Sequence, residues 1–125
     1  MNADIQILRR ELEDAATHLG RPHDLRFKPM FGGLMAWFGE KPCAWISTQG
    51  LALRLADADQ PALLAEEGAT RFRHRPDEPP SRDYILVPQA LRRDTVRFAE
   101  WLERSGDAPA AQKKRPRSKA RPRSG

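Results

Sequence analysis

Hydrophobic positions change their spacing several times along the chain, and each spacing predicts a different element. Between Ile5 and Leu19 they recur every three or four residues, which places them on one face of an amphipathic helix. This helix should end at Gly20 and Pro22, because glycine closes helices and proline cannot continue them. Residues 25–30 then lead into the next part of the chain.

Three short apolar runs follow, at residues 34–38, 43–47 and 51–55, separated by glycine, proline and polar residues. Runs of about five apolar residues between such turn signals are typical of an antiparallel β-meander. In the third run, leucines alternate with Ala52 and Arg54, which predicts one apolar face and one face that water can reach.

The second half of the chain predicts a short helix ending at Gly68 and two further strands at residues 70–75 and 83–87. A last helix should be capped by Asp94 and end at Gly106. Its inward residues are predicted to be Val96, Phe98, Ala99 and Leu102. The order predicts an α+β fold: one domain over residues 1–105, with an antiparallel sheet of about five strands flanked by N- and C-terminal helices.

The net charge of +5 belongs to the C-terminal tail. Past Ser105, seven basic residues against Asp107 alone give +6 and leave −1 for residues 1–105. We expect residues 106–125 to be disordered and to contact nucleic acid without sequence specificity, by neutralising phosphates. Alternatives are a purely solubilising extension and, less favoured without an apolar anchor, an acidic membrane surface. The basic residues are Lys113, Lys114, Arg115, Arg117, Lys119, Arg121 and Arg123.

The sequence contains few residues in arrangements that support catalysis, metal binding or membrane insertion. The sequence has no apolar run of about 18 residues and no signal peptide, and its single cysteine, Cys43, excludes an internal disulfide, so we expect a cytoplasmic protein without a membrane partner. His18, His23 and Asp24 do not have the spacing of a metal site, and no histidine is spaced to activate Cys43. The serines, acids and histidines form no catalytic arrangement, which predicts a protein that is not an enzyme and needs no cofactor.

Several features leave two interpretations open. Gly32 and Gly33 lack a phosphate-loop pattern, so we expect a tight bend or bulge with a positive φ or a backbone too close for a Cβ. Trp37 and Trp45 either pack in the sheet or stack on a base or ligand.

A row of arginines forms the last candidate site. If residues 70–75 form a strand, Arg71, Arg73 and Arg75 share one face, opposite Phe72 and His74. Arg54 could extend this row into a positive stripe for an acidic partner or a phosphate backbone, unless nearby acidic residues neutralise it.

The order of motifs resembles a known family. Met30, Phe31, Gly32 and Gly33 precede a hairpin of apolar strands, and a Leu-x-Leu strand runs into Asp-Ala-Asp. A later glycine leads to Phe72, a strand ends at Pro88, and the closing helix holds Trp101. Over residues 25–104 this resembles the N-terminal domain of the TfoX/Sxy family, with Met30 to Gly33 in a structural role.

The resemblance implies regulation rather than catalysis. Full-length members of the family regulate natural competence with a cyclic-AMP receptor-type activator and carry a second, helical domain, for which this chain has no room. We therefore expect a non-enzymatic regulatory or adaptor protein whose protein partner is a transcription regulator. The fold is also similar to small chaperone-like domains, so the alternative is a protein-binding module without a nucleic-acid role. The sequence does not indicate an oligomeric state.

Overall fold

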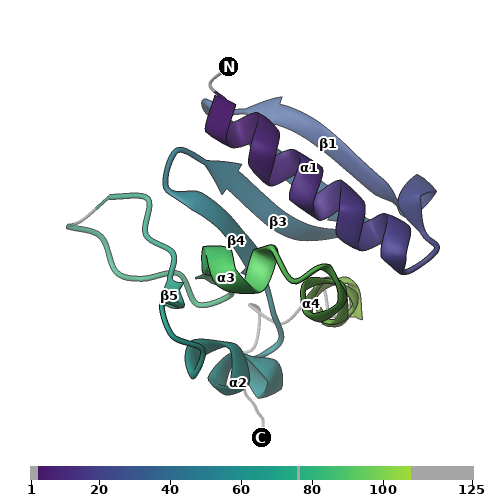
Figure 1. The fold of residues 1–125 in the computed structure, drawn as a ribbon. Helices are drawn as coiled ribbons and strands as arrows, with labels where there is room; N and C mark the ends of the chain where they lie inside the picture. The colour runs from purple at the N-terminus through teal and green to yellow at the C-terminus, as the bar shows by residue number, and fades with distance from the viewer. Residues whose placement is uncertain (1–2, 76, 108–125) are drawn as a thin grey trace, which may run out of the picture.

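The structure is a computed structural model that describes residues 3–75 and 77–107. It confirms an α+β fold in which helices pack on one face of an antiparallel sheet (Figure 1). The order of elements is α1 (Ala3–His18), η1 (Pro22–Asp24), β1 (Leu25–Met30), β2 (Gly33–Phe38), β3 (Lys41–Ser47), β4 (Gly50–Arg54), η2 (Asp57–Asp59), α2 (Gln60–Leu64), β5 (Thr70–Arg71), β6 (Tyr84–Leu86), α3 (Gln89–Arg92) and α4 (Thr95–Asp107).

The sheet has six strands in the order β1-β2-β3-β4-β6-β5, and every neighbouring pair is antiparallel. The strand beyond the expected five is β1, over residues that the sequence predicts only to lead into the meander. The prediction of a strand over residues 70–75 was wrong beyond Arg71, because β5 pairs with β6 only at Thr70 and Arg71. The chain then leaves the ladder after Phe72, whose N–H still donates to Tyr84 O at 2.9 Å.

The C-terminal end of α1 and the N-terminal cap of α4 agree with the prediction. Gly20 has φ +73°, and the N–H groups of Gly20 and Arg21 donate to Thr17 O and Ala16 O, which is a Schellman motif. Asp94 caps α4, since its Oδ1 accepts from the N–H of Arg97 at 3.2 Å.

Two details of α4 differ from the prediction. Val96 is 51% exposed instead of turned inward. Gly106 lies within α4 instead of ending it, because the helix continues to Asp107. A Cβ at Gly106 would lie 2.7 Å from the Phe38 ring, so the glycine lets the helix approach the sheet closely.

The main core lies between the helices and one face of the sheet. It is formed by fully buried side chains such as Leu12, Leu34, Ile46, Leu53 and Phe98. Figure 1 shows α1, α3 and α4 on this side of the sheet.

The opposite sheet face, which these helices do not cover, is here called the open face. It was predicted to be wet in β4, and this was wrong: Ala52 is fully buried and Arg54 is only 4% exposed. Trp45, Ala52 and Phe72 form a second, smaller hydrophobic cluster.

A β-bulge fastens α4 to the sheet. In the β2–β3 pair, Ala36 lies opposite Ala44 and Trp37 opposite Pro42, so Cys43 has no partner on β2. The Cys43 carbonyl, buried with its residue, accepts a hydrogen bond from Ser105 Oγ at 2.8 Å. This buried hydrogen bond joins the last turn of α4 to the bulge in β3.

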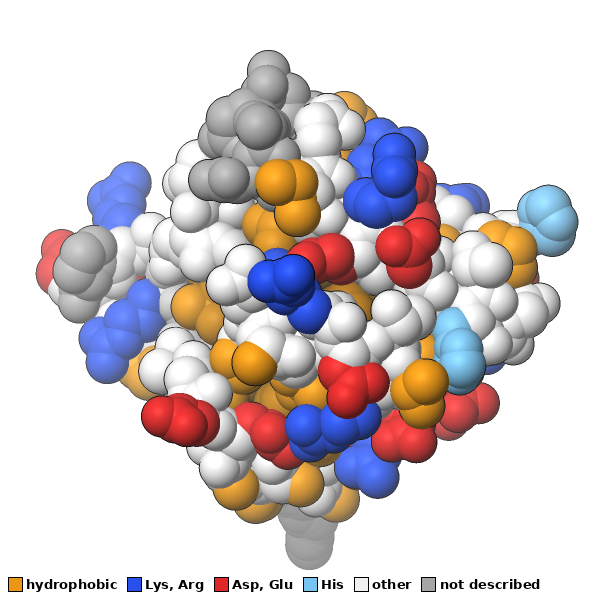
Figure 2. Space-filling model, viewed as in Figure 1, with side chains coloured by type: hydrophobic (Ala, Val, Ile, Leu, Met, Phe, Trp, Pro, Cys, Tyr) orange, Lys and Arg blue, Asp and Glu red, His pale blue; other side chains and the backbone are white. Residues whose placement is uncertain are grey.

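The surface of the molecule on the side of the helices is not dominated by charges of one sign. In Figure 2, basic and acidic side chains intermingle across it, with apolar side chains scattered between them. In the described part of the chain, no helix combines the length and apolar character needed to cross a membrane.

Candidate functional site

The β1–β2 hairpin ends in a turn that presents an aromatic side chain to solvent. Phe31 and Gly32 are its two central residues, with φ of +52° and +80°, the signs that a type I′ turn requires. Phe31 is the only described residue other than glycine with positive φ, and its exposed fraction is 93%. An unfavourable backbone region that holds a bulky, solvated side chain is an observation that suggests function.

The next glycine serves packing. A Cβ at Gly33 would lie 2.3 Å from Ile46 O and 2.9 Å from the Trp45 ring. The expectation of positive φ or close approach is therefore confirmed in both forms, one at each glycine of the pair.

Beside this turn, the open face contains a cavity of about 340 Å³, here called the hollow. Phe72 and His74 line one side, with their rings in edge contact at 4.8 Å. The alternation predicted for these two residues is thus correct. The remaining lining residues are Met30, Phe31, Met35, Trp45, Pro79, Ser81 and Tyr84. Methionine and aromatic side chains together make an apolar surface that adapts to the shape of a partner.

Hydrogen bonds hold the far wall of the hollow in place. Ser81 N donates to Phe72 O at 2.7 Å, and Ser81 Oγ accepts from the N–H groups of Asp83 and Tyr84 at 3.2 and 3.0 Å. Because this wall is tied to β6, the hollow is preformed, which lowers the entropic cost of filling it.

The predicted arginine row does not form. Arg71 donates to Gln60 Oε1 at 2.8 Å, Arg73 donates to Glu78 O at 3.0 Å, and Arg75 lies 3.9 Å from the Glu78 carboxylate. Arg54 cannot extend a surface stripe, because it is buried and donates to Pro42 O at 3.4 Å. A part for Arg71, Arg73 and Arg75 in partner binding stays a prediction.

The buried titratable groups are poor candidates for catalysis. Burial raises the pKa of the Cys43 thiol far above its usual value, so the thiolate is not available near neutral pH. Burial also raises the pKa of Tyr84 to about 12. Within residues 3–75 and 77–107, no group of three or more His, Cys, Asp or Glu side chains could hold a metal ion. The seven basic tail residues lie outside the described residues.

The structure separates the two tryptophans that the sequence left equivalent. Trp45 is 9% exposed and forms part of the hollow, whereas Trp37 is half-buried at the β1–β2 end of the open face. Sequence reasoning missed Met35 and Tyr84 as lining residues. Strand parity was the available signal, since Met35 lies two positions from Trp37 and directly opposite Trp45.

No curated protein and no solved structure matches the chain significantly. The profile of the TfoX N-terminal domain matches residues 17–108, a segment that includes the hairpin, the whole sheet and α4. The match covers well over half of the chain, and the chain belongs to the TfoX N-terminal domain family.

Proposed function

We propose that this protein is a regulatory adaptor, without catalytic activity of its own, that binds a transcription regulator through the hollow. Its family suggests a role in competence or regulation. The observation that carries the proposal is Phe31, which is 93% exposed in a positive-φ conformation at the rim of the hollow. A solvated aromatic ring next to a preformed apolar cavity is suited to become the buried anchor of an interface.

The contact we propose is an apolar or aromatic side chain of the regulator seated among Met35, Trp45 and Phe72, with Phe31 closing over it. The two methionines at positions 30 and 35 let the cavity adjust to that side chain. Few hydrogen-bonding groups face the hollow, so the interaction would be driven by burial of apolar surface.

Photo-crosslinking tests this proposal. Benzoylphenylalanine at position 31 of the full chain, in cells, should give one discrete adduct that contains a transcription regulator. The matched control places the same group at Val96, which is also exposed but lies on α4, away from the hollow. Equal adduct patterns from both positions, or none from position 31, would contradict the proposal.

A second candidate function rests on the tail. Its seven basic residues and near absence of acids suit non-specific contact with nucleic acid, which would hold the adaptor near the DNA on which its partner acts. The alternative is a chaperone-like protein-binding module without any nucleic-acid role. It predicts that removing the tail has no effect on partner binding or on regulation.

A further inference from the structure

The β1–β2 end of the open face carries a second surface, separate from the hollow, formed by Arg26, Lys28 and Trp37. We call it the basic–aromatic corner. Arg26 lies directly opposite Trp37 in the ladder, and Lys28 lies opposite Met35, one step along the same face. Arg26 and Lys28 are exposed, and Trp37 is half-buried.

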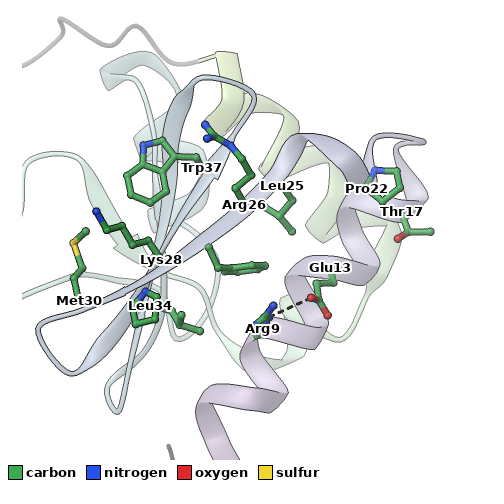
Figure 3. A pocket seen from close by; sticks show the side chains of 12 residues that line it. Arg9, Glu13, Thr17, Pro22, Leu25, Arg26, Lys28, Met30, Leu34 and Trp37 are labelled. Carbon is green, nitrogen blue, oxygen red and sulfur yellow. Dashed lines mark hydrogen bonds and ion pairs between the residues drawn. The ribbon is translucent and has the colours of Figure 1, made fainter.

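The alternation of β1 explains why these side chains meet. Leu25 and Phe27 pack against the main core under α1, so Arg26 and Lys28 must point to the other face. Figure 3 shows both cations on the same side of β1 as the Trp37 indole, with Arg9 and Glu13 of α1 on the opposite side. The groove along β1, about 1030 Å³, is therefore two surfaces divided by an edge strand.

The two cations are not neutralised within the described part of the chain. Arg26 donates one N–H to Gly39 O at 3.1 Å, which fixes the guanidinium while leaving its other donors available. Neither Arg26 nor Lys28 forms an ion pair there. Of the acids near this strand in sequence, Asp24 pairs with Arg21 at 2.7 Å and Glu13 pairs with Arg9 at 3.2 Å. Glu40 follows Gly39 in the next turn, is exposed, and forms no ion pair with Arg26 or Lys28.

This combination matches the chemistry of an unpaired nucleotide. A flat indole ring offers a stacking surface for any base, because every base has a π face. Arg26 and Lys28 stand about 6.8 Å apart along the strand, so they can contact neighbouring phosphates of one chain. A duplex presents phosphates but keeps its bases stacked inside, so it cannot use Trp37.

We propose that the basic–aromatic corner binds single-stranded nucleic acid, with a base stacked on Trp37 and phosphates held by Arg26 and Lys28. This goes beyond the proposed function, since it involves a different ligand and different residues. It also differs from tail binding, which depends on phosphates alone and gains nothing from an unpaired base.

The test compares a labelled 12-nucleotide oligo(dT) with a 12-base-pair duplex, both titrated with the full chain. Trp37→Leu should weaken oligo(dT) binding at least fivefold and abolish the tryptophan quenching that binding causes, while duplex affinity stays unchanged. Trp37→Phe should retain part of the affinity, because phenylalanine can still stack.

The charge contribution needs a matched control. Arg26→Ser with Lys28→Ser should weaken oligo(dT) binding more than Arg10→Ser with Arg93→Ser, a pair of exposed arginines on α1 and after α3 that carries the same charge. This pair of variants also keeps the proposal testable if Trp37→Leu fails to fold. Changing Phe31 should leave oligo(dT) binding intact, which separates this proposal from the adaptor function.

Three results would overturn the proposal. The first is unchanged oligo(dT) affinity in Trp37→Leu. The second is an equal loss for oligo(dT) and duplex, which would assign all binding to phosphate contacts. The third is Trp37-dependent binding of an acidic, aromatic 12-residue peptide with no such dependence for oligo(dT), which would make the corner a peptide site.

Discussion

Gly32 and Gly33 are neighbours, but they are needed for different reasons, and their substitution should have different costs. Gly32 has positive φ with open space around its Cα, so Gly32→Ala should cost only the left-handed backbone penalty of about 1–2 kcal/mol. Gly33→Ala drives a methyl group into Ile46 O and the Trp45 ring, so we expect a loss of about 3 kcal/mol or more. Urea unfolding of the two variants measures the difference.

Asparagine substitutions supply the control for this pair. Asparagine tolerates positive φ, so Gly32→Asn should be milder than Gly32→Ala, whereas Gly33→Asn should be at least as harmful as Gly33→Ala. A Gly33→Ala variant as stable as the wild-type chain would contradict the close packing of Gly33 against Ile46 O and the Trp45 ring.

Single residues were predictable where the backbone alone decides their use. The Gly-Gly pair could be assigned to tight geometry because only glycine accepts either constraint. The environment of Arg54 could not be predicted, because the cover over its end of the open face comes from segments distant in sequence. The exposure of Val96 could not be predicted either. Its spacing from the other apolar residues of α4 predicts a buried side chain, but the side chain is exposed to solvent.

Among the elements, α4 depends most clearly on one polar contact. Ser105→Ala removes the hydrogen bond from α4 to the buried Cys43 carbonyl at the bulge, so we expect a loss of about 0.5–1.5 kcal/mol in the free energy of unfolding. Glu103→Ala, on the exposed side of the same helix, is the matched control and should change stability by less than about 0.5 kcal/mol. Equal stability of the two variants would show that water or another group satisfies the carbonyl.

The spacing of hydrophobic residues along the chain predicted α1, α4 and the meander, because each of these elements buries one continuous face. It failed at β5, where alternation continues to Arg75 although pairing stops at Arg71. Alternation reports which way side chains point, and Phe72 and His74 do point into the hollow. It does not report whether a neighbouring strand is present to accept hydrogen bonds.

The tail gives the whole chain most of its positive charge, and its contribution can be measured separately. A chain ending at Asp107 should lose most of its affinity for duplex DNA. Binding by the full chain should weaken with salt at a log–log slope of about −0.9 per phosphate neutralised. Gel-shift or fluorescence titrations at several salt concentrations measure both effects.

Removing the tail should not change the melting temperature, since the core is built from residues before position 103. Equal duplex affinity of the two chains at low salt would contradict a nucleic-acid role for the tail.

The family and the α+β fold could be inferred from the sequence because they depend on the order of elements. The hollow could not, since it forms only when the hairpin turn, β6 and the segment after β5 meet.

At Phe31, stability and partner binding should change in opposite directions if this residue is the anchor of the interface. Phe31→Asn creates the Asn-Gly pair that type I′ turns prefer and removes a side chain with few contacts. The free energy of unfolding should therefore rise by up to about 1 kcal/mol, or about 4–8 °C in melting temperature.

Calorimetric titration of Phe31→Asn with the regulator captured by the crosslink tests the account most directly. We predict at least tenfold weaker binding from this more stable variant, while Val96→Ser, on the far side of the sheet, binds as the wild-type chain does. Unchanged affinity in Phe31→Asn would contradict the assignment of the hollow and its aromatic rim as the partner site.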